Sequence, residues 1–337
     1  MFEFHKYPSI DNSYRTRTIN EIYKHGFHKQ DWVVLLKVHG ANFSLWTDGE
    51  TLKPAKRSSF IGDNENFCNY QSVVDAVKDN IKKAFKILNE KYNCSEVVFY
   101  GELAGGEYPH PKVEKFPNAK RVQKGVFYAP FNFFYIFDIV VDGKYIDHDE
   151  VLEICWDCGL IVAEPLAKGT FDDCIKYPNE FEDPLHKYFG LPSIDDNICE
   201  GVVIKPNKAC FFGNGSRCIL KNKNEKFSEK NSSKKKIKKP KEPMSNEGEM
   251  LQTVLESYVT ENRLRNVLSH GIVIGQKDFG VLMKEMNVDV WDDFIKDNGD
   301  RYKCLEPDEQ KIIKKSLNKM TANLIRPHFQ DIVDGEF

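Results

Sequence analysis

Lys37 stands between a run of apolar residues, 32–36, and the pair His39 and Gly40. The apolar run is typical of a buried strand, and a glycine lets the backbone approach a bulky ligand closely. A lysine at such a strand end can be a salt-bridged or partly solvated side chain. It can also be a nucleophile, if burial and neighbouring cations keep its amine partly neutral. The other charged segments must distinguish these two interpretations.

Further charged or aromatic residues lie in or at the ends of predicted strands: Lys56 with Arg57, Glu102 after Tyr100, Phe137 with Asp138, Glu200 with Lys205, and Lys221 with Lys223. Residues two apart share one face of a strand. Lys221 and Lys223 could therefore lower the pKa of a nearby lysine amine and hold a phosphate group.

In this order and spacing, these segments resemble the nucleotidyltransferase motifs of polynucleotide ligases and RNA capping enzymes. The KxHG form at Lys37 and the string KNKNEKFSEK at 221–230 narrow the match. The chain resembles the nick-sealing, ATP-dependent RNA ligases of the RNA ligase 2 type, to which the RNA-editing ligases of kinetoplastids are related. The resemblance extends over nearly the whole chain, including 42–44, 258–260 and 277–280.

The resemblance implies a reaction in three steps. Lys37 attacks ATP to form lysyl-AMP, AMP moves to the 5′-phosphate of a nick, and a 3′-hydroxyl seals the nick. ATP and Mg²⁺, or Mn²⁺, are the implied cofactors. Nicked duplex RNA or RNA ends are the implied partners, in RNA repair or RNA joining.

The resemblance also implies roles for individual residues. Phe137 is expected to stack on adenine, Glu102 to contact the ribose, and Glu200 to bind the metal, since a hard carboxylate oxygen suits Mg²⁺. The implied catalytic residues are Lys37, His39, Glu102, Glu200, Lys221 and Lys223. The implied ATP contacts are Leu36, Lys37, Val38, Asn42, Arg57, Glu102, Phe137, Lys205, Lys221 and Lys223. The implied RNA contacts are Lys56, Arg57, Phe67, Asp138, Arg263 and Asp289.

The chain departs from the family at two positions. Leu36 stands where the family often has a glutamate, so a side-chain contact to adenine is lost there. Phe67 is followed by Cys68 where the family can carry paired phenylalanines.

The elements that must position these residues follow from local patterns. An amphipathic helix is predicted around Ile19, Ile22 and Tyr23, ending near Gly26, and further helices are predicted at 73–89, 147–159 and 171–177 from apolar spacing and capping signals. A hairpin turns at Asp48-Gly49, and strands are predicted at 96–103, 133–141, 198–206 and 218–223. The sequence therefore predicts an α+β fold: a nucleotidyltransferase (ATP-grasp-like ligase) domain of antiparallel sheets with flanking helices.

The composition changes to lysine, serine and proline at 226–243. We expect an adenylyltransferase domain at 1–230, a lysine-rich linker at 231–243, and a small all-helical, RNA-binding domain at 244–337. The lysine run is either a solvated charge run or a contact to nucleic-acid phosphate.

The composition limits the other possibilities. A net charge of -3 excludes a uniformly basic nucleic-acid coat. Nine cysteines and the absence of a signal-peptide pattern favour reduced thiols and an intracellular, cytoplasmic protein, and a monomer is expected. Cys155 and Cys158 have the spacing of half a metal site or a redox pair, but the sequence has no second pair of ligands to accompany them. The longest apolar run, 126–141, is too short to span a membrane.

Two alternatives remain open. DNA ligases and capping guanylyltransferases share the covalent lysyl-nucleotide chemistry, but those families usually have aspartate at the His39 position and attach an OB-fold. A catalytically silent RNA-binding protein could also keep the fold. The sequence contains no GxxxxGK[ST], which argues against a P-loop kinase or ATPase.

Overall fold

The computed structural model describes residues 2–62, 65–227 and 244–337. The chain forms two compact units, Met1–Asn224 and Glu225–Phe337. The boundary lies a few residues before the expected one at 230. The expected linker at 231–243 lies outside the described residues.

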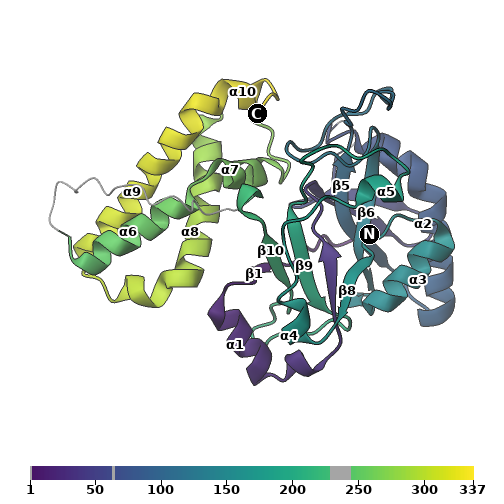
Figure 1. The fold of residues 1–337 in the computed structure, drawn as a ribbon, viewed down its shortest axis with the longest axis horizontal. Helices are drawn as coiled ribbons and strands as arrows, with labels where there is room; N and C mark the ends of the chain where they lie inside the picture. The colour runs from purple at the N-terminus through teal and green to yellow at the C-terminus, as the bar shows by residue number, and fades with distance from the viewer. Residues whose placement is uncertain (1, 63–64, 228–243) are drawn as a thin grey trace. The chain divides into compact units, whose positions relative to one another are not determined.

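The first unit contains two five-stranded sheets (Figure 1). Sheet A has the order β1-β10-β9-β2-β8, with β1 parallel to β10 and the other pairs antiparallel. Its strands are β1 (Asp11–Asn12), β2 (Trp32–Leu36), β8 (Pro165–Gly169), β9 (Gly201–Pro206) and β10 (Leu220–Lys223). All five residues of β2 are buried because β2 lies inside the sheet, between β9 and β8.

Sheet B is fully antiparallel, with the order β4-β3-β5-β6-β7. Its strands are β3 (Ala41–Thr47), β4 (Leu52–Lys56), β5 (Val97–Gly105), β6 (Asn132–Val141) and β7 (Lys144–Tyr145). Phe43 and Leu45 face one core, while Trp46 faces another on the opposite side of the sheet. This alternation is the period-2 pattern of a sheet that is covered on both faces.

Helices cover the sheets. The core on one face of sheet B includes residues of α2 (Tyr70–Tyr92) and α3 (His148–Cys158), and Figure 1 shows both helices along that sheet. Buried residues of α1 (Thr16–Lys24) and α4 (Phe171–Cys174) pack with sheet A. The short elements η1 (Phe27–Lys29) and α5 (Leu185–Tyr188) complete the helices of this unit. The predicted α+β architecture is confirmed.

The second unit is helical among its described residues. After η2 (Glu225–Phe227) come α6 (Asn246–Tyr258), α7 (Glu261–Leu268), α8 (Phe279–Lys303), α9 (Pro307–Ile325), η3 (Arg326–His328) and α10 (Phe329–Val333). Buried residues of α6 to α10 form one core. No helix among the described residues is long and apolar enough to cross a membrane.

Candidate active site

Lys37 lies where the chain passes from one sheet to the other. β2 of sheet A ends at Leu36, β3 of sheet B begins at Ala41, and residues 37–40 connect them. The Lys37 backbone N–H still donates to the Gly201 carbonyl at 3.0 Å. A Cβ on Gly40 would lie 2.4 Å from the Leu103 carbonyl oxygen. Gly40 therefore approaches the backbone of β5 closely, whereas the sequence predicted a close approach to a bulky ligand.

Glu200 is the centre of the ion-pair cluster at this site. Its Oε2 accepts from Lys37 Nζ at 2.8 Å, and its Oε1 lies 3.0 Å from Lys223 Nζ. His39 Nδ1 lies 3.7 Å from Oε2. The Glu200 side chain is 1% exposed. One buried carboxylate thus draws together residues from the connector and from β10.

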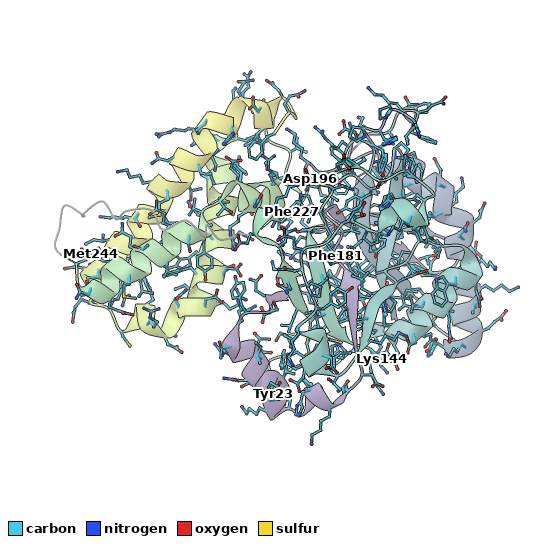
Figure 2. The ribbon with its side chains drawn as sticks, viewed as in Figure 1. Tyr23, Lys144, Phe181, Asp196, Phe227 and Met244 are labelled. Atoms are coloured by element: carbon cyan, nitrogen blue, oxygen red, sulfur yellow. The ribbon has the colours of Figure 1, made fainter. Side chains whose placement is uncertain are left out.

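The backbone around Glu200 is fixed on both sides. The Cys199 N–H donates at 3.0 Å to the carbonyl of Phe181, which is labelled in Figure 2. The Asn224 N–H donates to the Glu200 carbonyl at 3.0 Å. Gly201 has a φ of +140°, and a Cβ there would lie 2.1 Å from the Asn222 carbonyl oxygen. A glycine is therefore required after Glu200 for β9 to pair closely with β10.

The charges around Glu200 keep it ionised. Burial by itself raises the pKa of a carboxyl group. The positive charges of Lys37 and Lys223, with His39, outweigh burial and hold the pKa of Glu200 well below its usual range. A buried carboxylate with two ammonium partners avoids the cost of an unpaired buried charge.

Glu102 is the second carboxylate of the site and has a different environment. It lies on β5, paired with Asn42 of β3 and Tyr135 of β6, and is half-buried. Burial raises its pKa to about 7, Glu200 contributes to the rise, and Lys37 and Arg57 oppose it. The carboxyl group makes no hydrogen bond or ion pair to any residue that the structure describes.

Arg57 follows β4 and also retains unused bonding capacity. Its Nε is buried and has no hydrogen-bond partner among the described residues. Unpaired buried polar groups are rare in proteins and call for an explanation. An unpaired Glu102 carboxyl group and an unpaired Arg57 Nε, near the paired Glu200, fit a site that binds a polar ligand.

Four further predicted ATP contacts lie on or next to the strands of the two sheets. Phe137 is a half-buried residue of β6, with its ring centroid 5.0 Å from that of Tyr7. Leu36 and Val38 flank Lys37 and are buried. Lys221 lies on β10 with Lys223, two residues away and on the same face. Stacking of Phe137 on adenine and phosphate binding by Lys221 stay predictions.

Asp138 and Lys205, which the sequence assigned to RNA and ATP, lie in a buried network. Lys205 Nζ donates to Asp138 Oδ1 at 2.7 Å and to the Phe137 carbonyl at 2.8 Å. Arg217 binds both oxygens of Asp138, at 2.6 and 2.9 Å, and the Tyr7 hydroxyl donates to Asp138 at 2.6 Å. All four side chains are buried, and their contacts connect β6 to β9. Binding of RNA by Asp138 and of ATP by Lys205 stays a prediction.

The same network sets the ionisation of its members. Burial would raise the pKa of Asp138, but Arg217 and Lys205 reverse this and lower it. Burial lowers the pKa of Lys205 to about 8, opposed by Asp138. Arg217 and Tyr7 were not predicted from the sequence. The hydroxyl of Tyr7 accepts from Arg217 at 2.8 Å across 210 residues, a separation that no local pattern reveals.

Other predicted RNA contacts are also engaged with protein. Phe67 is buried in the core between sheet B and its helices, so its ring does not reach the surface. Lys56 forms an ion pair with Glu65. In the second unit, Arg263 is 2% exposed and binds Asp289 at 2.5 Å and Asp293 at 3.0 Å. The Arg263 ion pairs join α7 to α8, the Lys56 ion pair holds the end of β4, and Phe67 fills the core. Direct contact of these residues with RNA stays a prediction.

Tyr128 is a site residue that sequence reasoning missed. Its hydroxyl accepts from the His39 backbone N–H at 2.6 Å, and it is buried. Burial raises its pKa well above the usual value, and the charge of Asp183 adds to the rise. Gln123 Nε2 donates to the Gly40 carbonyl at 3.4 Å. The sequence offers one signal for this residue, a tyrosine at the end of a segment rich in proline and lysine.

The site contains two carboxylates, Glu200 and Glu102, that could contact a metal ion. The described residues contain no group of three or more His, Cys, Asp or Glu side chains that could hold a metal ion. Mg²⁺ commonly uses one or two carboxylates together with water and substrate phosphates. Glu200 and Glu102 are two carboxylates of this kind, so the residues fit a cation that arrives with a phosphate ligand.

Comparison with known proteins identifies the family. A family model described as RNA ligase matches residues 30–223, more than half of the chain. The chain therefore belongs to the RNA ligase family. A second model, described as T4 RNA ligase 2 C-terminal, matches residues 241–323, and the two matches together place the chain with the RNA ligase 2 type.

Two curated relatives come from Trypanosoma brucei brucei. RNA-editing ligase 1, mitochondrial, is 34% identical over 236 residues, covering 60% of this chain and 50% of that protein. The chain thus spans about half the length of this relative. RNA-editing ligase 2, mitochondrial, is 28% identical over 351 residues, covering 87% of this chain and 83% of that protein.

Solved structures of Naegleria gruberi RNA ligase also align with this chain. A variant with ATP and Mn has a TM-score of 0.44 and 13% identity, and the alignment covers 66% of this chain and 57% of the other. A variant with AMP and Mn gives a TM-score of 0.44 at 14% identity, over 67% and 58% of the two chains.

Proposed function

We propose that this chain is an ATP-dependent RNA ligase that seals 3′-OH/5′-phosphate nicks, preferentially in duplex RNA. One observation carries the proposal. Lys37 Nζ and Lys223 Nζ lie 2.8 and 3.0 Å from the two oxygens of one buried carboxylate, Glu200. The unpaired Glu102 carboxyl group and Arg57 Nε add ligand-binding capacity nearby.

In the first step, the Lys37 amine attacks the α-phosphorus of ATP. A phosphorus–nitrogen bond forms, the bond to the bridging oxygen breaks, and pyrophosphate leaves with the electron pair. The attacking amine must be neutral. Because Lys37 donates to Glu200, this ion pair must open and the ammonium must lose a proton before attack. Lys221 and Lys223 would hold the phosphate and stabilise its developing charge.

In the second step, a 5′-phosphate oxygen of RNA attacks the phosphorus of lysyl-AMP. A phosphoanhydride forms, and Lys37 leaves and regains its proton. In the third step, the 3′-hydroxyl attacks the 5′-phosphate, the nick closes, and AMP leaves. Both are in-line phosphoryl transfers, in which the protein mainly positions the groups and neutralises charge.

ATP and a divalent cation, Mg²⁺ or Mn²⁺, fit this site. When bound, the cation would neutralise phosphate charge beside Glu200. Phe137 would stack on adenine, and Glu102 would contact the ribose.

The first experiment is intact mass spectrometry after incubation with ATP and Mg²⁺. The wild-type chain is expected to gain the mass of one AMP, and Lys37→Ala is expected to gain none. Lys144→Ala is the matched control, because Lys144 is an exposed lysine of β7 and is labelled in Figure 2. A chain that forms the adduct is then assayed on nicked duplex RNA and on nicked DNA of the same sequence.

Each outcome separates the candidate functions. Sealing of RNA in preference to DNA supports the proposal, and preference for DNA would assign a DNA ligase. An adduct with GTP alone would assign a capping guanylyltransferase. No adduct with any nucleotide would assign a silent RNA-binding protein.

The location and oligomeric state are part of the proposal. We expect a monomer in the cytoplasm that binds nicked RNA through both units. The two trypanosome relatives are named as mitochondrial proteins, so organelle fractionation is the direct test. Sedimentation analysis with and without RNA tests the monomer.

A further inference from the structure

A loop at 107–125 follows β5 and carries a basic surface. It contains five basic residues and two acidic ones, in a chain whose net charge is -3. Glu107 pairs with Arg121 at 2.6 Å. The side chains of Lys112, Lys115 and Lys120 are exposed and have no carboxylate partner among the residues that the structure describes. The loop thus concentrates positive charge at one place on the first unit.

Aromatic rings lie beside these lysines. Phe116 is 57% exposed, and its ring lies 5.8 Å from that of Phe131. Phe131 contacts Phe189 at 5.3 Å, and Phe189 contacts Tyr188 at 5.1 Å. Tyr188, at the end of α5, is 52% exposed. The four rings therefore form a continuous row in which Phe131 and Phe189 pack against each other and the end rings, Phe116 and Tyr188, are exposed.

The loop is anchored to the rest of the unit. The Tyr108 hydroxyl donates to the Pro192 carbonyl, beyond α5. The Asn197 side chain binds both the N–H and the carbonyl of Phe127, at 2.8 Å each, and Figure 2 labels the adjacent Asp196. The loop and α5 are thus held together as one surface.

The same segment reaches the Lys37 connector. Gln123 donates to the Gly40 carbonyl, and Tyr128 accepts from the His39 N–H at 2.6 Å. The ring contacts continue from Phe189 to Phe133 at 4.9 Å and from Phe133 to Tyr128 at 6.4 Å. The exposed rings are therefore connected by packed side chains to the backbone beside the proposed nucleophile.

We propose that this aromatic–basic surface (Lys112, Lys115, Phe116, Lys120, Tyr188) binds an unpaired segment of an RNA strand close to the nick. Phe116 and Tyr188 would stack on bases, and the lysines would contact phosphates. Stacking on exposed rings requires unpaired bases, because bases inside a duplex present only their edges. The inference rests on the proposed ligase function, since RNA is the ligand it assumes.

The test measures binding of a fluorescent single-stranded oligoribonucleotide by anisotropy. The double variant Phe116→Ala/Tyr188→Ala is expected to raise the Kd about tenfold or more. Trp156→Ala is the matched control, because Trp156 is an aromatic residue of α3 that is 56% exposed, and its Kd should equal that of the wild type. Thermal melting of each variant checks the fold.

Two further measurements separate stacking from charge. Replacing Lys112, Lys115 and Lys120 with Gln should reduce the slope of log K against log salt by about 2, since each single-strand phosphate contact contributes about 0.7. In the Phe116→Ala/Tyr188→Ala variant, the affinity for a blunt duplex RNA should fall less than the affinity for the single strand. A Kd for the single strand within twofold of wild type, or an equal loss on the duplex, overturns the inference. Absence of an AMP adduct in the wild type would instead overturn the proposed function.

Discussion

Lys37 and Glu200 are 163 residues apart in the sequence and form a part-buried ion pair, with Nζ 2.8 Å from Oε2. The ion pair holds the lysine in place. In the proposed reaction Lys37 must leave this pair before its amine can attack ATP, so the residue that positions Lys37 also restrains it. This relationship leads to the first prediction.

Replacing Glu200 with Gln is expected to slow adduct formation about a hundredfold or more. The change removes the charge that orients Lys37 and Lys223 and leaves two ammonium groups facing an uncharged amide. The time course of AMP incorporation by intact mass measures the rate. Glu153→Gln, on the exposed face of α3, is the control. A rate within a few-fold of wild type would show that Glu200 does not serve the first step.

Replacing Tyr128 with Phe should slow adduct formation about five- to tenfold without unfolding the protein. The buried His39 N–H loses its acceptor, and an unsatisfied buried donor costs about 1 to 3 kcal/mol. The rate of AMP incorporation is compared with that of Tyr92→Phe, which removes an exposed hydroxyl bonded to Glu150. Equal rates in the two variants would contradict a positioning role for Tyr128.

Replacing Asp138 with Asn is expected to lower the free energy of unfolding by about 3 to 5 kcal/mol, because it leaves buried Lys205 and Arg217 without their carboxylate. Urea unfolding monitored by fluorescence measures the change. Asp157→Asn, an exposed aspartate of α3, should change it by less than about 0.5 kcal/mol. If Asp138 acted only on RNA, both variants would unfold alike.

The raised pKa of Glu102 predicts a pH dependence of stability. The pKa rises from 4.5 to about 7 in the folded state, chiefly through burial. The folded state therefore holds this proton more tightly than the unfolded state does. The stability from this group is fully present below pH 4.5 and is lost as the pH rises towards 7. Melting temperatures between pH 4.5 and 7 should decline less in Glu102→Gln than in the wild type, and parallel curves would refute the assignment.

Local patterns predicted the elements well. Apolar spacing indicated the helix now found at Thr16–Lys24, and Asp48-Gly49 indicated the turn between β3 and β4. The long helix Phe279–Lys303 was not predicted, although its buried residues Leu282, Met286, Val290 and Phe294 recur every four positions. Its acidic and polar residues between those positions obscured the apolar face.

The site was predicted in part. The charged strand ends at Lys37, Glu200 and Lys223 do meet, because β2, β9 and β10 are neighbours in sheet A. The partners of Asp138 could not be predicted, since they come from the chain start and from position 217 through pairings that only the folded sheet creates. Burial of Phe67 and Arg263 could not be predicted from the sequence either, because the residue type alone does not show which face of its segment packs against the protein.

The four-residue connector at 37–40 joins sheet A directly to sheet B. A ligand held by Lys223 on one sheet and Glu102 on the other would therefore be a second link between the two sheets, beside the backbone connector. Such a cross-link opposes separation of the sheets, and it stabilises the folded state by RT ln(1 + [L]/Kd) if the ligand binds only that state. Bound nucleotide should accordingly raise the melting temperature of the first unit and leave that of the helical unit unchanged. The order in which the two units melt in one calorimetric scan would then show whether the site is occupied.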